Sequence, residues 1–185
     1  MNVLKCNGER LWGSLMDMAK IGATAKGGNC RLALSAEDAA GRDLFMSWCR
    51  AEGMTLGFDA IGNLFARRAG LDDSLAPIVM GSHLDTQPKG GRFDGIYGVL
   101  SGLEVVRCLN EQDIQSQRPI EIAVWTNEEG ARFTPAMFGS AVFTGSLPLQ
   151  TALDARDADG ISVAQALEAT GHTGELAFER AFDAY

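Results

Sequence analysis

Two short apolar runs, with an amphipathic stretch between them, occupy the centre of this 185-residue sequence. Residues 78–82 are apolar without alternation, which is typical of a strand buried on both faces. Residues 119–126 form a second such run, with isoleucine and valine at alternate positions. Residues 99–111 place leucine and valine at helical spacing. Strand, helix and strand in this order predict a parallel β-α-β unit and therefore an α/β fold.

The remaining segments predict elements that surround this unit. Residues 55–58 and 63–67 favour two strands joined by a bend. Three more helices are expected, over residues 8–20, 35–53 and 162–169, and each starts beside a residue that can cap it: Asn7, Ser35 and Ser162. Together these segments predict a single three-layer α/β/α domain with a mostly parallel central sheet.

Composition excludes several classes of protein. The net charge of −8 argues against nucleic acid or an anionic membrane surface as a partner. No signal peptide is recognisable over residues 1–10, and no run approaches the roughly 20 apolar residues that span a bilayer. Four scattered cysteines without a Cys-x-x-Cys pair predict reduced thiols. We therefore expect a cytoplasmic globular protein.

Polar residues gather after both predicted central strands. His83 and Asp85 follow the first strand, Asp94 lies in the glycine-rich loop beyond them, and Glu128 and Glu129 follow the second strand. Open α/β sheets bind their ligands just past the carboxyl ends of the strands. Each feature alone is more typical of a structural histidine, a turn or a solvated surface. Their convergence on one β-α-β unit favours a metal site instead.

The residue types suit divalent metal chemistry. The His83 imidazole is a ligand for zinc, manganese, cobalt or nickel. Asp85, two residues later, is placed to accept the other ring N–H of His83. Asp94 has glycine neighbours, so its carboxylate can turn toward the site and bridge two ions. Because Glu128 and Glu129 are adjacent, their side chains diverge, and one can bind metal while the other acts as a general base.

Longer motifs carry a family resemblance. Three of them look like the metal motifs of the dinuclear zinc-dependent peptidase and amidohydrolase superfamily: His83-Leu84-Asp85-Thr86, Gly91-x-x-Asp94-Gly95 and Asn127-Glu128-Glu129-Gly130. The detailed sequences of residues 81–95 and 126–137 are similar to those of the N-carbamoyl-L-amino acid hydrolase and β-ureidopropionase branch. The resemblance extends over essentially the whole chain and includes Asp59-x-Ile61-Gly62-Asn63.

The resemblance implies specific roles. His83 and Glu129 would each bind one of two divalent ions (Zn, Mn, Co or Ni), and Asp94 would bridge them. Glu128 would be the general base, and Asp85 would orient His83. The implied reaction is hydrolysis of the carbamoyl C–N bond of an N-carbamoyl amino acid. A cis peptide bond between Asp94 and Gly95 is also implied, which is unusual for a non-proline bond.

The resemblance also implies parts that this sequence does not supply. Further ligands would come from a His-Ile-Glu-Gln-Gly-type segment shortly after an aromatic-rich run like residues 178–185, and from a histidine near the family's C-terminus. His172 matches neither motif and is expected on a surface loop. Residues 1–185 would then be the N-terminal part of the catalytic domain, without the family's lid and dimerisation domain. Substrate-binding residues are expected beyond Tyr185, so we expect little activity from this chain alone.

Two other interpretations stay open at this point. Allantoate amidohydrolases, aminoacylases and peptidases of the same superfamily share the metal motifs, so the substrate is not fixed by them. A non-catalytic α/β module, either a truncation product or a binding remnant, is the alternative from a different class. Metal content and turnover of N-carbamoyl amino acids distinguish the enzyme from the module.

Overall fold

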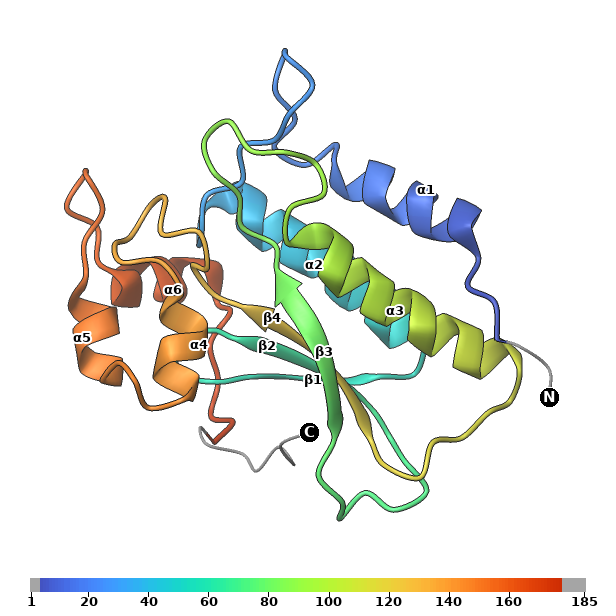
Figure 1. The fold of residues 1–185 in the computed structure, drawn as a ribbon. Coiled ribbons are helices and arrows are strands. Elements are labelled where there is room, and N and C mark those ends of the chain that lie inside the picture. Colours follow the sequence, from blue (N-terminus) through green and yellow to red (C-terminus); the bar gives the residue numbers. More distant parts are fainter. Residues whose placement is uncertain (1–3, 178–185) are drawn as a thin grey trace.

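A four-stranded mixed sheet carries helices in the computed structural model, which describes residues 4–177 (Figure 1). The strands are β1 (Thr55–Phe58), β2 (Leu64–Arg68), β3 (Ile78–His83) and β4 (Ile120–Trp125). The helices are α1 (Gly8–Met18), α2 (Ala36–Ala51), α3 (Ile96–Glu111), α4 (Phe138–Phe143), α5 (Leu149–Asp154) and α6 (Val163–Thr170). Within residues 4–177, no helix has both the length and the apolar character that a bilayer crossing needs.

The sheet has the order β1-β2-β4-β3. β3 and β4 are parallel and joined through α3, so the predicted α/β fold and its parallel β-α-β unit are confirmed. The prediction of a mostly parallel sheet is wrong for the described strands, because β1 pairs antiparallel with β2 and β2 antiparallel with β4. The short β1–β2 connection forces an antiparallel hairpin, and the hairpin joins the sheet through β2.

On one face of the sheet, α2 and α3 contact the strands and α1 packs on α3, and the three helices lie together on one side in Figure 1. Leu64 of β2 and Val124 of β4 point into this core, where they meet Phe45 of α2 and Leu103 of α3. On the opposite face, Phe143 of α4 is the helical residue that packs on the sheet in a smaller cluster. The three helices of the first face therefore enclose the main core of the described chain.

Strand β3 is more exposed than its apolar sequence predicts. Ile78 is 43% exposed and Gly81 is exposed, so the expectation of a strand buried on both faces is wrong. β3 lies at the edge of the described sheet, with β4 as its neighbour. Only His83, at the end of β3, is buried, because it lies under the start of α3.

The predicted helix starts are confirmed by their capping contacts. Asn7 accepts the Arg10 N–H at α1, and Ser35 accepts the Asp38 N–H at α2. α6 has a complete capping box between Ser162 and Gln165. Such caps each stabilise a helix by about 1 kcal/mol.

His172 is not the surface residue that the sequence predicts. It is only 7% exposed, and its ring stacks on Phe58 of β1 with 5.3 Å between centroids. Its Nε2 lies 3.0 Å from Asp43 Oδ1 of α2. His172 therefore fastens the segment after α6 to both the sheet and α2.

We expect His172→Ala to lower the free energy of unfolding by about 1–3 kcal/mol, because it removes a stacked ring and a hydrogen bond together. Urea denaturation followed by far-UV circular dichroism measures this change. Thr173→Ala is the matched control, since the Thr173 hydroxyl makes only long contacts of 3.4 and 3.5 Å and its loss should cost under about 0.5 kcal/mol. Equal stability of the two variants would contradict the role given to His172.

Candidate metal centre

His83 ends β3 with its ring in a defined orientation. Nδ1 lies 2.9 Å from the main-chain oxygen of Asp85, and because a carbonyl oxygen only accepts, Nδ1 carries the hydrogen. Nε2 is therefore the ring nitrogen available to a metal ion. It faces two carboxylates, with Glu128 Oε2 at 3.3 Å and Asp94 Oδ1 at 4.0 Å. The structure thus brings His83, Asp94 and Glu128 together.

The Asp85 carboxylate joins the segments that follow β3 and β4. It accepts the main-chain N–H groups of Glu128, at 3.3 Å, and Glu129, at 3.2 Å. Its Oδ1 is 3.7 Å from His83 Nδ1, so the main-chain oxygen of Asp85 holds the imidazole more closely than the carboxylate does. Burial, with the nearby Asp38 carboxylate, raises the pKa of Asp85 to about 6.

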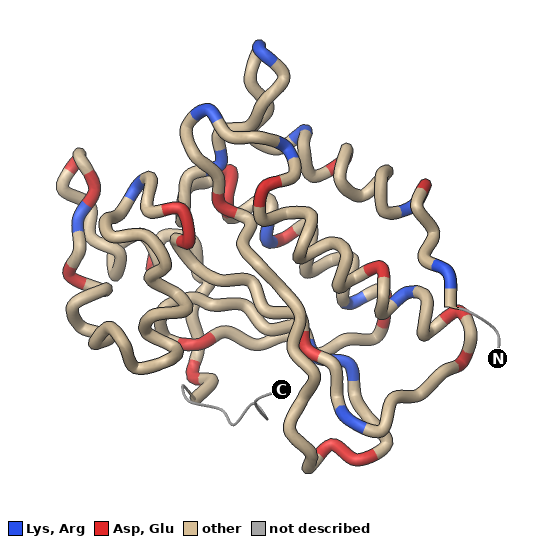
Figure 2. Tube along the Cα trace, in the orientation of Figure 1, with Lys and Arg blue, Asp and Glu red and all other residues tan. Residues whose placement is uncertain are grey.

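The two glutamates after β4 diverge, as adjacent residues do. Glu128 faces His83, whereas the Glu129 carboxylate accepts a hydrogen bond of 2.7 Å from Gln87 Nε2. Asp94 remains largely open to solvent, with its side chain 72% exposed. Figure 2 shows acidic residues gathered where β3 and β4 end. Gln87, which contacts Glu129, is a neighbour that the sequence did not indicate.

Gly95 lets the His83 ring sit against the start of α3. Its φ is +72°, and a Cβ built there would lie 2.5 Å from three atoms of the His83 ring. No other residue type fits this position without displacing the imidazole. The cis bond implied between Asp94 and Gly95 is wrong, because the cis peptide bond among residues 4–177 is Thr134–Pro135. A peptide bond that precedes proline tolerates cis far better than one that precedes glycine.

These donors suit a divalent ion in kind. An imidazole nitrogen with neighbouring carboxylates is a ligand set for zinc, manganese, cobalt or nickel. Within the described part of the chain, no group of three or more histidine, cysteine, aspartate or glutamate side chains is arranged to hold an ion. The set predicted from the sequence, His83, Asp94 and Glu129, is therefore present as strand-end residues and not as an assembled site.

A buried polar network supports the segment after β4. Asn63 accepts the Thr126 N–H at 2.9 Å and donates to Asp59 Oδ2 and to the Gly139 carbonyl. Arg42, paired with a buried aspartate on α2, donates to the Thr126 hydroxyl at 3.2 Å. A Cβ at Gly139 would lie 2.1 Å from Asn63 Oδ1, so glycine is needed there. The resemblance of residues 59–63 was the sequence signal for this network.

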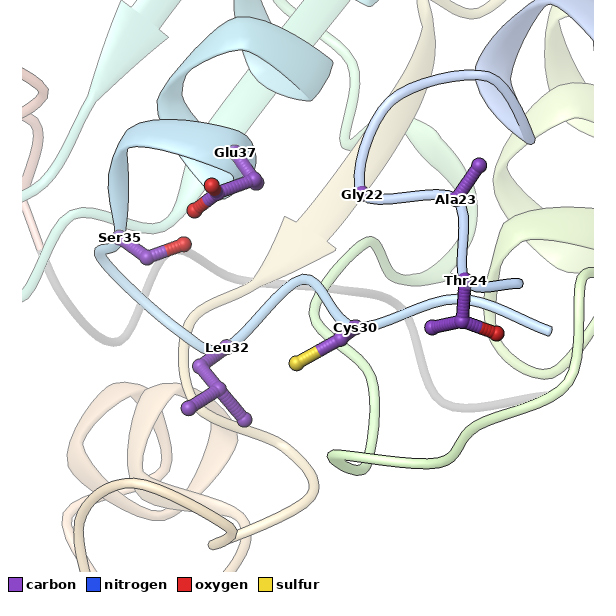
Figure 3. Close-up of a pocket in the computed structure, with 7 residues that line it drawn as sticks. All are labelled: Gly22, Ala23, Thr24, Cys30, Leu32, Ser35 and Glu37. Carbon is purple, nitrogen blue, oxygen red and sulfur yellow. The ribbon is translucent and has the colours of Figure 1, made fainter. Parts of the chain in front are cut away.

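A pocket of about 300 Å³ lies elsewhere, between the loop before α2 and the start of that helix (Figure 3). Its lining comprises Gly22, Ala23, Thr24, Cys30, Leu32, Ser35 and Glu37. None of the residues predicted to bind metal or to act in catalysis lines this pocket. The strand-end residues remain the candidate centre.

Comparisons with known proteins agree on one group. Peptidase family M20/M25/M40 matches residues 79–177. The N-carbamoyl-L-amino-acid amidohydrolase of Rhizobium meliloti is 49% identical over 92% of this chain and 41% of its own length. The enzyme of that name from Geobacillus stearothermophilus is 44% identical over 89% of this chain and 40% of its own. The chain thus spans less than half the length of these relatives.

A solved structure agrees in fold. The crystal structure of a hydantoinase/carbamoylase family amidase from Burkholderia ambifaria is 61% identical and covers 100% of this chain and 45% of its own, with a TM-score of 0.97. An aminopeptidase PepT structure from Bacillus cereus is 20% identical with a TM-score of 0.55, which supports the fold alone.

We expect Asn63→Ala to lower the free energy of unfolding by about 2–4 kcal/mol, because three buried groups lose their partner at once. Urea denaturation measures the loss. Asn110→Ala is the control: its amide also makes three hydrogen bonds, two to Glu52 and one from Arg68, but all three are only partly buried and lie far from the candidate centre. The prediction is wrong if Asn63→Ala costs no more than Asn110→Ala.

Proposed function

The chain belongs to peptidase family M20/M25/M40, and on that basis we propose that it carries catalytic residues for hydrolysis of the carbamoyl C–N bond of N-carbamoyl amino acids. Dependence on metal ions is general in this family. The names of the relatives at 49% and 44% identity support the substrate class. The specific ions, and the use of two of them, are part of the proposal.

One observation carries the chemistry: His83 turns Nε2, the ring nitrogen not bonded to the main chain, toward Glu128 and Asp94. A histidine whose other nitrogen is fixed by a main-chain acceptor is oriented as a metal ligand. Glu128 lies 3.3 Å from this nitrogen, which supports its role as the base that takes a proton from a water molecule.

We assign the roles as follows. His83, Asp94 and Glu129 hold divalent metal, which when bound supplies Lewis-acid activation of water and of the ureido carbonyl. Glu128 accepts the proton of the attacking water and returns it to the leaving nitrogen. Asp85 holds His83 and the Glu128–Glu129 main chain in place. Hydrolysis then yields the amino acid, ammonia and carbon dioxide.

The alternative substrates have weaker support. The allantoate amidohydrolase of Bacillus subtilis is 33% identical over 89% of this chain, well below the carbamoyl amino acid relatives. The ureidoglycolate hydrolase of Arabidopsis thaliana is 32% identical over 77% of this chain. We therefore favour an N-carbamoyl amino acid.

We also propose that these residues form part of a catalytic domain whose activity needs further ligands and substrate-binding groups. The share of the two carbamoyl amino acid relatives that this chain covers, 41% and 40% of their lengths, supports this part of the proposal. The resemblance also implies a homodimer, formed through a dimerisation domain expected outside residues 1–185. A cytoplasmic location remains a prediction, supported by four cysteines that are all free.

In the protein that carries this sequence, we expect Glu128→Gln to lower kcat for an N-carbamoyl-L-amino acid by about 10²–10⁴-fold, because glutamine cannot accept the proton. Release of ammonia measures the rate. Mn²⁺ affinity, measured by isothermal titration calorimetry, should stay within about threefold, since Glu128 is not an assigned ligand.

Glu111→Gln, at the far end of α3, is the matched control and should leave the rate unchanged. Full activity of Glu128→Gln, or hydrolysis that persists after exhaustive chelation, would rule out the proposed mechanism.

A further inference from the structure

We propose that Arg31 is a positioning residue of the candidate metal centre, acting through residues 84–86; this inference rests on the proposed function. Arg31 belongs to the irregular segment before α2, and its side chain is fully buried. It touches neither His83 nor the carboxylates assigned to metal, so its effect is transmitted through the main chain that follows β3.

Three hydrogen bonds join Arg31 to residues 84–86, two through the main chain of Arg31 and one through its side chain. The Arg31 N–H donates to Thr86 Oγ1 at 2.8 Å, and the Thr86 N–H donates to the Arg31 carbonyl at 2.8 Å. The Arg31 Nε–H donates to the Leu84 carbonyl, also at 2.8 Å. The residues on both sides of Asp85 are therefore held by the same arginine.

This arrangement sets both contacts of Asp85. With Leu84 and Thr86 fixed, the Asp85 carbonyl faces His83 Nδ1 and its carboxylate faces the N–H groups of Glu128 and Glu129. A shift of the segment by a fraction of an ångström would loosen the first metal ligand and the loop that carries the second. Arg31 thus acts on both halves of the centre.

The other contacts of Arg31 anchor it from the opposite side. Nη1 donates to the Ile21 carbonyl at 2.7 Å, and Nη2 is buried without a hydrogen-bond partner. On α2, a Cβ at Gly41 would lie 3.0 Å from Arg31 Cδ, so glycine leaves room for the arginine stem. A buried guanidinium with an unpartnered nitrogen is costly. The buried Arg31 guanidinium offsets this cost through the geometry that it imposes on residues 84–86.

Hydrogen exchange measured by mass spectrometry on Arg31→Lys tests this inference directly. Lysine keeps the positive charge but lacks the planar guanidinium group, so it cannot reproduce the Nε–H bond to the Leu84 carbonyl. We expect faster exchange at the N–H groups of Thr86, Glu128 and Glu129, with β4 unchanged. Mn²⁺ affinity of the same variant should fall about 10–100-fold, the usual effect of losing an outer-shell contact.

Arg68→Lys is the matched control. Arg68 lies at the far end of β2, donates from Nε to Asn110 and from Nη2 to the Ile114 carbonyl, and also has one buried nitrogen without a hydrogen-bond partner. Its replacement should lower the melting temperature comparably, yet leave exchange at residues 84–86 and 127–129 and Mn²⁺ affinity unchanged. If the role of Arg31 were purely structural, Arg31→Lys and Arg68→Lys would show the same hydrogen exchange and the same Mn²⁺ affinity.

The outcomes separate the two proposals. Unchanged exchange in Arg31→Lys, or a uniform rise over the whole chain, overturns the role of Arg31. If the wild-type protein that carries this sequence, with its further ligands, binds no Mn²⁺ but the local exchange changes as expected, the proposed function fails and the positioning role stands. Should Arg31→Lys not fold, Thr86→Val removes the hydroxyl that accepts the Arg31 N–H and donates to the Gln87 carbonyl. Thr86→Val should give the same local rise in hydrogen exchange, and absence of that rise overturns the inference.

Discussion

The candidate centre depends on the hydrogen bonds of Asp85. Its carboxylate accepts two main-chain N–H groups from the segment after β4, and its carbonyl orients the histidine that ends β3. Two loops that are more than 40 residues apart in sequence are thereby joined. A buried carboxylate is stabilised by such donors, and they offset part of the cost of its burial. If Asp85 were displaced, the residues assigned to metal would lose their common frame.

Buried polar groups lie beneath both segments that Asp85 joins. Arg31 lies under the segment after β3, while Arg42 and Asn63 lie under Thr126 after β4. Each strand end is thus supported by buried polar groups instead of apolar packing alone. The apolar core below comes from the face of the sheet covered by α1, α2 and α3. The apolar core holds the sheet in place, and the polar groups hold the segments that follow β3 and β4.

Much of this could be predicted from the sequence, because local patterns are sufficient for local structure. The caps at Asn7, Ser35 and Ser162 and the apolar runs gave the helices and strands, and the polar residues after each run indicated the site. Strand order could not be predicted, since pairing of β2 beside β4 depends on contacts distant in sequence. The burial of His172 was missed because its partners, Phe58 and Asp43, lie more than 100 residues earlier.

The in-register pairing of β3 with β4 means that the candidate donors are placed by two different parts of the fold. His83 lies directly opposite Trp125, so the segments that carry His83 and the two glutamates start from neighbouring main chains about 4.8 Å apart. Sheet hydrogen bonding therefore fixes these two starting points independently of loop length. Asp94, by contrast, lies on the glycine-rich loop, so insertions into that loop would move its carboxylate relative to His83 while leaving the two strand ends unchanged.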